Sequence, residues 1–252
     1  TNATFDSYTK LMIHMDGTEA STTFTDSETT PKTVTANGNA QIDTAQKVFG
    51  TASGLFDGTG DYLSLADSDD WYYGTGDFTI DFRVRFAALP STNIWFGFYN
   101  QWQDTTNQIR LSVHNSAGSY YLELYVNDAN SDFTIQSAAV SFAINTWYHI
   151  AYVRNGNNWM IFVDGVQSGT TTVNTNDVPN LACDLDIPDN TAHNVSLNGW
   201  LDEFRISKGI ARWTANFTPP TLAYSFSLQS YSESTIKTQG SYSLKGVADA
   251  LF

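Results

Sequence analysis

Three carboxyl groups fall within six residues in the segment 184–189, which reads Asp-Leu-Asp-Ile-Pro-Asp. Enzymes that cleave glycosidic bonds with retention of configuration use two carboxyl groups about 5–5.5 Å apart. Residues i and i+2 of a strand share a face, so Asp184 and Asp186 are expected to point the same way. However, all three acids are the short Asp, and Pro188 breaks the strand before Asp189. We therefore favour a loop rim or a second ion site over catalysis, and we count Asp186 as a candidate ligand-binding residue.

A second candidate is the polar and aromatic stretch 98–110, in which Trp102 is surrounded by polar residues without the alternation that would bury it. Sugar rings stack on exposed aromatic faces, and Asn, Asp and Gln side chains hold their hydroxyl groups. The simpler alternative, that an aromatic residue of this stretch belongs to the core, stays open. Besides Asp186, the candidate ligand-binding residues are Tyr99, Gln101, Trp102 and Asn107.

The charge balance restricts the possible partners. Lys and Arg total 12 residues against 26 for Asp and Glu, which gives a net charge of −14. An acidic surface repels nucleic acids and anionic membranes and suits neutral ligands, calcium or basic partners, although solubility alone is also a sufficient reason for it. The sequence contains no apolar run of about 18 residues, so membrane insertion is not expected.

Length and cysteine content narrow the class further. The 252 residues suffice for one large β domain, because sandwiches often reach about 200–250 residues as a single unit. The single cysteine, Cys183, allows no disulfide within the chain, which favours a bacterial, viral or marine source over a secreted animal module. The sequence starts at Thr1 without a signal peptide, and we expect it to be an excised or processed fragment.

Strands are the elements that must position these residues. From Phe78 to Phe86 every second residue is apolar and the residues between them are polar or charged, which predicts a strand with one buried face. Asp164-Gly165 predicts a tight hairpin turn, and Asn37-Gly38 predicts another. About a dozen such segments, without a sustained helical period, predict an all-β fold that is a two-sheet antiparallel β-sandwich of the jelly-roll type.

The amino-acid composition changes after Pro219-Pro220, and a double proline commonly ends a sheet domain. We expect residues 1–10 to be a lead-in and residues 11–223 to form the sandwich. Residues 224–252 are expected to be either a C-terminal extension that packs on the sandwich or the start of a further β domain. These two alternatives stay open.

Several strings, in order along the chain, resemble the laminin G-like domains of the concanavalin A-like lectin/glucanase superfamily, in the version common in bacterial and phage surface proteins. They are Leu11–Gly17, Leu55–Leu63, Gly76–Phe82, Asn145–Ala151, Phe162–Gly165, Gly199–Ile206 and Ala211–Phe217. The resemblance implies two antiparallel sheets packed face to face, with aromatic residues between them. It also implies a role in binding glycans or proteins, in adhesion, or as part of an enzyme, and the fold alone does not choose between these roles.

The resemblance further implies a structural calcium site. Many relatives hold one calcium ion with an acidic residue of the last strand and groups of the N-terminal segment, and the matching residues here are Asp16, Gly17 and Asp202. Calcium takes about six to eight oxygen ligands from carboxylates, carbonyls and water. The alternative is that Asp16 closes a turn and Asp202 pairs with Arg205 or with nearby backbone.

Lyases on related sandwiches use a set of Gln, His, Tyr and Arg side chains. Gln108, Arg110, His114 and Tyr121 form a similar set, but the motifs of those lyases are missing. We therefore expect a non-catalytic glycan-binding or adhesion module, with a carbohydrate as its partner, in an extracellular, cell-surface or virion protein. The alternatives are a glycan-cleaving hydrolase or lyase, and a structural assembly domain whose tail packs on another subunit of a homo-oligomer.

Overall fold

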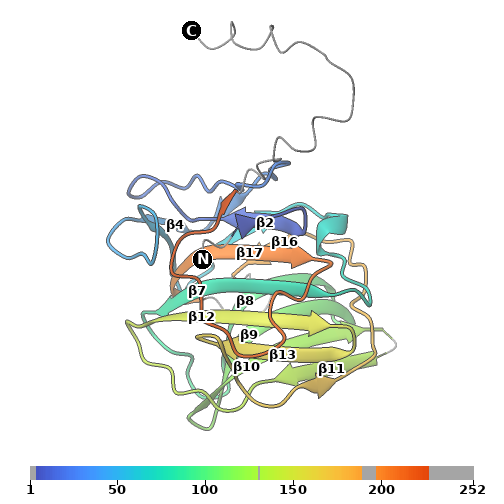
Figure 1. Cartoon of the computed structure of the whole chain (residues 1–252). Helices are drawn as coiled ribbons and strands as arrows, with labels where there is room; N and C mark the ends of the chain where they lie inside the picture. The colour runs from blue at the N-terminus through green and yellow to red at the C-terminus, as the bar shows by residue number, and fades with distance from the viewer. Residues whose placement is uncertain (1–3, 130, 189–196, 227–252) are drawn as a thin grey trace, which may run out of the picture.

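A computed structural model describes residues 4–129, 131–188 and 197–226 of the chain (Figure 1). Two sheets of seven and nine strands pack face to face, and every strand pair within them is antiparallel. The predicted fold class, an all-β two-sheet sandwich, is therefore confirmed.

The two sheets are built from strands that lie far apart in the sequence. In spatial order, the seven-stranded sheet consists of β11 (Ser131–Gln136), β10 (Ser119–Asp128), β9 (Asn107–Ser116), β8 (Trp95–Asp104), β16 (Leu185–Ile187), β6 (Tyr62–Leu65) and β3 (Thr35–Asn37). In the same order, the nine-stranded sheet consists of β14 (Val166–Gln167), β13 (Asn158–Val163), β12 (Trp147–Asn155), β7 (Phe78–Phe86), β17 (Asn198–Lys208), β5 (Ser53–Asp57) and β4 (Gln41–Asp43), with β15 (Thr172–Val173) on β13 and β2 (Thr9–Ile13) on β17. In Figure 1, β17, β7, β12 and β13 lie in front of β8, β9 and β10.

The core lies between the two sheets and follows the alternation of the strands. On β7, Phe78, Phe82 and Phe86 are all 0% exposed, as the sequence pattern predicts. The ring of Phe82 meets that of Phe98 on the facing sheet at a centroid distance of 4.9 Å. Each fully buried side chain of this size contributes about 1.5–3 kcal/mol, so the shared apolar interior is the main source of stability.

The two predicted hairpin turns have different outcomes. Asp164 and Gly165 have φ values of 49° and 76° and join β13 to β14, with Val163 paired to Val166, as a two-residue turn with positive φ requires. The prediction for Asn37-Gly38 is wrong, because β3 pairs with β6 in one sheet whereas β4 pairs with β5 in the other. The chain crosses between the sheets at this point.

The outer face of the nine-stranded sheet is covered by the C-terminal segment 209–226. Trp213 and Phe217 stack on each other at 4.0 Å and pack on the outward side of β12 and β13. Gly165 lies so close to Phe217 that a Cβ atom at this position would clash with the Phe217 carbonyl oxygen. The segment is therefore seated on the sheet rather than lying free beside it.

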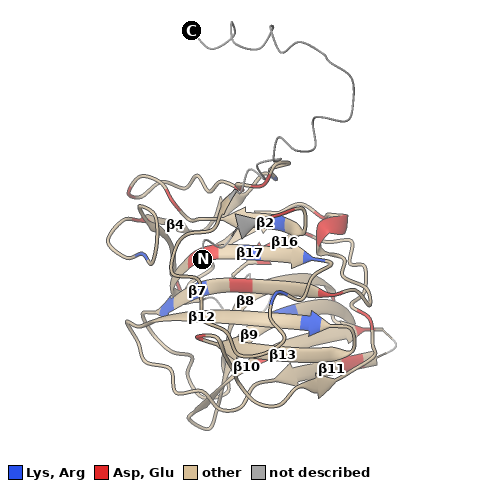
Figure 2. Ribbon diagram, in the orientation of Figure 1, with Lys and Arg blue, Asp and Glu red and all other residues tan. Residues whose placement is uncertain are grey.

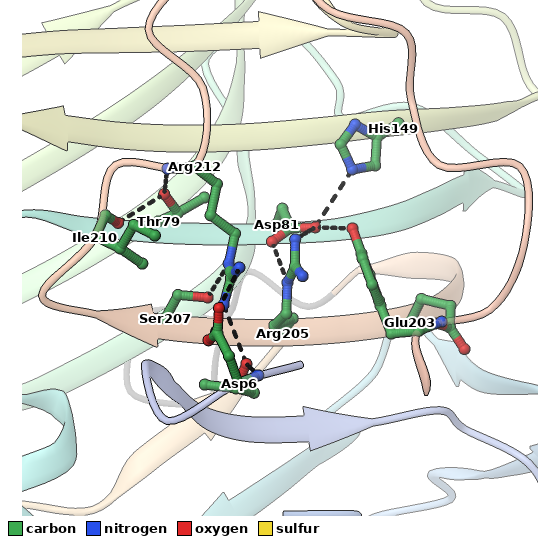
Figure 3. A network of polar contacts seen from close by, with 11 residues as sticks. Asp6, Thr79, Asp81, His149, Glu203, Arg205, Ser207, Ile210 and Arg212 are labelled. Carbon is green, nitrogen blue, oxygen red and sulfur yellow. Dashed lines mark hydrogen bonds and ion pairs between the residues drawn. The ribbon is translucent and has the colours of Figure 1, made fainter. Parts of the chain in front are cut away.

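Near the end of this segment, Tyr224 contacts a buried ion pair between Asp81 and Arg205 (Figure 3). Asp81 on β7 accepts hydrogen bonds from Arg205 Nε at 2.9 Å and from the Tyr224 hydroxyl, and His149 Nε2 lies 3.4 Å away. The Tyr224 ring covers the Arg205 guanidinium at 3.7 Å, and Tyr224 N–H donates to Glu203 Oε2 at 2.7 Å. Burial alone would raise the pKa of Asp81, but the charge of Arg205 and the bonds from His149 and Arg205 hold that pKa well below its usual range.

The two ends of the described chain meet. β1 (Thr4–Phe5) pairs in parallel with β18 (Ser225–Phe226). The domain limits at residues 11 and 223 stay a prediction, and residues 227–252 of the expected C-terminal extension lie outside the described residues. Within the described ranges, none of the helical segments has the length and apolar character needed to cross a membrane.

Substituting Asp81→Ala should lower the free energy of unfolding by about 3–5 kcal/mol, because the buried Arg205 would lose its counter-ion. The exposed Asp67, which takes no part in this network, serves as the control, and Asp67→Ala should change the free energy of unfolding by less than about 0.5 kcal/mol. Urea unfolding followed by tryptophan fluorescence measures both. A loss below about 1 kcal/mol for Asp81→Ala would show that the ion pair is not the fastening we describe.

Candidate ligand-binding site

The outer face of the seven-stranded sheet is polar, in contrast to its inner face. On β9, Ile109, Leu111 and Val113 enter the core, and the residues between them point outward. The cross-strand register brings the outward residues of β8, β10 and β16 beside them. We call this surface the polar face; its residues are Trp95, Asn100, Trp102, Gln108, Arg110, Ser112, His114, Tyr121, Glu123, Tyr125, Asn127 and Asp186.

A β-bulge in β8 decides which residues reach this face. The register shifts between Gly97 and Tyr99, so Phe98 and Tyr99 are adjacent in sequence and both 0% exposed in the core. Before the bulge Trp95 pairs with His114, and after it Asn100 pairs with Arg110, all on the polar face. A bulge inserts one extra residue, so each residue after it points to the face opposite the one that strict alternation would give.

Glu123 organises one half of the polar face. Its carboxylate accepts hydrogen bonds from Trp95 Nε1 at 2.8 Å and from Gln136 Nε2 at 2.7 Å, and His114 Nδ1 lies 3.2 Å from Oε1. The Trp95 and His114 rings are stacked at 4.0 Å with an interplanar angle of 5°. These contacts fix the orientation of both rings before any ligand arrives, and His114 Nε2 is left without a hydrogen bond.

Buried polar atoms without a hydrogen-bond partner are concentrated on the polar face. Among the described residues nine such side-chain atoms occur, and six of them belong to the polar face. They are Asn100 Nδ2, Asn100 Oδ1, Gln108 Oε1, Arg110 Nε, Ser112 Oγ and His114 Nε2. Each unpartnered buried group costs about 1–3 kcal/mol, so a contiguous set of them marks a place where something other than the protein supplies the partners.

The predicted ligand-binding residues are divided by this geometry. Trp102 and Asp186 lie on the polar face, where they pair with Gln108 and Asn100. Tyr99 and Gln101 lie on the core side of β8, where the Tyr99 hydroxyl donates to Gln101 Oε1 at 2.7 Å, so neither side chain reaches the polar face.

Asn107 and Asp184 lie away from the centre of the polar face. Asn107 closes the β8–β9 hairpin and donates its amide to Asp104 at 2.9 Å. Asp184 precedes β16, and Asp189 lies outside the described residues.

Sequence reasoning missed part of the polar face. It did not select Asn100, Ser112, Glu123 or Trp95 as ligand-binding residues. The signal for Ser112 was present, because Gln108, Arg110, Ser112 and His114 alternate with three apolar residues. Asn100 could not be placed without knowing the bulge that precedes it.

The predicted calcium residues meet around one loop. Val48 and Phe49 N–H groups donate to Asp202 Oδ2 at 2.7 and 3.2 Å, and Ala52 N–H donates to Asp16 Oδ1 at 3.1 Å. Gly17 is exposed beside Asp16. The acid of the last long strand and the acid of the N-terminal segment thus both hold this loop, residues 48–52.

Asp202 provides an environment that suits a cation. Its Oδ1 atom is buried and has no hydrogen-bond partner. Burial is the main reason that the pKa of Asp202 is raised to about 7. The charges of Glu203 and Asp16 also raise this pKa, whereas the hydrogen bonds from the loop N–H groups lower it. No group of three or more His, Cys, Asp or Glu side chains in the described ranges is arranged to hold a metal, so an ion at Asp202 would depend mainly on backbone carbonyl oxygens.

A separate hollow of about 330 Å³ lies on the other sheet, between β4, β5 and the turn that follows β3. Its lining includes Gln41, Leu55 and Asp57 but none of the predicted ligand-binding residues. The hollow contains none of the unpartnered buried atoms, which is why we place the candidate site on the polar face instead.

Comparison with known families identifies the class of the chain. A laminin G-type family model, described as the Concanavalin A-like lectin/glucanases superfamily, matches residues 57–212. The chain therefore belongs to this superfamily. A search of curated protein sequences gives no significant match.

Solved structures share the fold at low sequence identity. The binding domain of Paraclostridial Mosquitocidal Protein 1 has a TM-score of 0.61 and 15% identity, with 81% of this chain and 49% of that chain covered. The receptor binding domain of botulinum neurotoxin D has a TM-score of 0.59 and 13% identity, with 81% and 50% covered. Domain 4 of AbnA, a GH43 extracellular arabinanase from Geobacillus stearothermophilus, has a TM-score of 0.56 and 15% identity, with 84% and 95% covered. The chain thus spans about half of the two toxin domains and nearly all of the arabinanase domain.

Two substitutions should distinguish polar-face residues that stabilise the fold from those whose polar groups have no partner in the protein. Glu123→Ala should lower the free energy of unfolding by about 1–3 kcal/mol, because Trp95 Nε1 and Gln136 Nε2 lose their acceptor. Ser112→Ala should leave it unchanged within about 0.5 kcal/mol, because Ser112 Oγ has no partner to lose. Thermal unfolding measures both, and equal losses for the two variants would contradict the assignment.

Proposed function

We propose that this chain is a non-catalytic glycan-binding module and that the polar face is its binding site. The single observation that carries the proposal is the cluster of unpartnered buried polar atoms between aromatic side chains. Sugar hydroxyls both donate and accept hydrogen bonds, so one glycan can satisfy an amide, a hydroxyl and an imidazole at once. The tryptophan and tyrosine rings beside these groups suit the apolar faces of sugar rings.

The comparisons support a carbohydrate as the partner without assigning one. The arabinanase domain was solved in complex with arabinotriose. The binding domain of botulinum neurotoxin DC, which is 16% identical with a TM-score of 0.57, was solved in complex with SialylT. The arabinanase is extracellular, and the toxin domain is named for binding. We extend this to an extracellular or surface location and an adhesive role for the present chain.

Trp102→Ala should weaken glycan binding at least about 10-fold, because a tryptophan that stacks on a ligand commonly contributes about 2 kcal/mol or more. The wild-type chain is first applied to a glycan array, and the affinity for its strongest hit is then measured by calorimetry for both proteins. Asn100→Ala should weaken binding comparably without loss of thermal stability, because its amide makes no internal hydrogen bond.

Gln41→Ala, in the hollow on the opposite sheet, is the matched control and should bind as the wild type does. Silence of the wild-type chain across the whole array would contradict the proposal. The release of new reducing ends or unsaturated products from the bound glycans would favour a cleaving enzyme instead of a binding module.

The calcium ion is a separate part of the proposal. It would bind Asp202 Oδ1 together with backbone carbonyls near Asp16 and Gly17, and it would compensate the charge of a buried carboxylate. The ion would thereby fasten the loop 48–52 and the N-terminal segment to β17. Its role is structural, because the site belongs to the nine-stranded sheet and the polar face to the other one.

Addition of calcium to chelator-treated protein should raise its stability by about 2.7 kcal/mol at a concentration 100 times the dissociation constant. Asp202→Asn should abolish this increase, whereas Asp67→Asn at an exposed position should not. Titration calorimetry and thermal unfolding measure the effect. The absence of both heat and stabilisation in the wild-type chain would remove calcium from the account.

A further inference from the structure

Arg110 differs from every other arginine of the chain. The other five donate hydrogen bonds to Pro220, Asn145, Gly156, Asp81 and Asp6 or to further acceptors beside them. The Arg110 guanidinium makes no hydrogen bond and no ion pair with any residue of the described ranges, and its Nε atom is buried. The chain has 12 basic residues against 26 acidic ones, so an arginine with neither a hydrogen bond nor an ion pair is unusual in it (Figure 2).

The surroundings of Arg110 hold its guanidinium in place without satisfying it. Arg110 lies on β9 between Asn100 of β8 and Tyr125 of β10. Its Cζ atom is 6.0 Å from the centroid of the Trp95 ring and 5.7 Å from that of Tyr125. Contacts with aromatic faces stabilise the cation, but they leave the N–H donors in its plane without acceptors.

An unpaired guanidinium is unfavourable for the folded chain alone. The Nε atom of Arg110 is buried, which removes water from this donor, and no internal acceptor replaces that water. A donor without an acceptor inside the protein is suited to bind an acceptor that a ligand supplies. The group that replaces the missing partner must be an acceptor, and a planar anion with two oxygens matches the fork of a guanidinium best.

We propose that Arg110 binds a carboxylate of the ligand, so that the glycan recognised by the polar face is an acidic one that carries uronic or sialic acid residues. This inference rests on the proposed glycan-binding function. The unpartnered amides of Asn100 and Gln108 flank Arg110 and would bind hydroxyl groups of the same or the adjoining sugar.

Two carboxylates near Arg110 and the overall charge act against an acidic ligand, and their effect is limited. Glu123 is already the acceptor for Trp95, Gln136 and His114. Asp186 lies one strand further away, across Asn100. The net charge of −14 slows the approach of an anion, but salt at physiological strength screens it beyond about 8 Å. The bidentate contact itself is short-ranged and keeps its strength.

The test uses two pairs of ligands, and within each pair the carboxylate is either free and charged or esterified and neutral. Trigalacturonate is compared with its methyl ester, and sialyllactose with the methyl ester of its sialic acid carboxyl group, by calorimetry on the wild type, Arg110→Gln, Arg110→Lys and the control Gln41→Ala. The wild type should bind the carboxylate form of at least one pair about 10- to 100-fold more tightly than its neutral counterpart. Arg110→Gln should lose this preference, and Arg110→Lys should keep only part of it.

Thermal unfolding distinguishes a role of Arg110 in ligand binding from a role in the fold, because a structural role would make Arg110→Gln unfold at a lower temperature than the wild type. Arg110→Gln should unfold at the same temperature as the wild type or higher, because it removes a charge that has no internal partner. A clear loss of stability would overturn the inference, and so would equal binding of the charged and neutral ligands. If an array detects only neutral glycans, the inference fails and the proposed function stands; if no glycan binds, both fail.

Discussion

The fold depends on a single constraint, which is that the two sheets must share one apolar interior. A strand has two faces, and this chain gives one face of nearly every long strand to the interior that Phe82, Phe98 and Leu111 help to fill. The other face of each sheet then has to be covered or be compatible with water. The two sheets solve this in different ways, and the difference defines the functional side of the molecule.

The nine-stranded sheet is covered by its own chain. The segment 209–226 packs Trp213 and Phe217 on its outer face, and Tyr224 closes over the buried pair of Asp81 and Arg205. The outer face of the seven-stranded sheet instead carries buried polar groups without hydrogen-bond partners, among them Asn100 and Ser112. Of the nine unpartnered buried atoms in the described residues, six thus lie on the seven-stranded sheet, and the other three belong to strands of the nine-stranded sheet.

Much of the fold was predictable, because it follows from strict alternation and from turn residues such as Asp164 and Gly165. The candidate site was predictable only in part. Trp102 and Asp186 lie on the polar face, whereas Tyr99 and Gln101 point to the core because of the bulge after Gly97. Neither this bulge nor the crossing of the chain at Asn37-Gly38 has a local sequence signal, since both depend on which strands become neighbours.

The central claim is that a glycan binds the outer face of the seven-stranded sheet. A crystal structure of the chain with a bound oligosaccharide tests it most directly. The account predicts electron density for sugar against β8 and β9, with ligand atoms within hydrogen-bond distance of Asn100, Arg110 and His114 Nε2. Sugar bound to the nine-stranded sheet or to the loops alone, with these groups left to water, would contradict it.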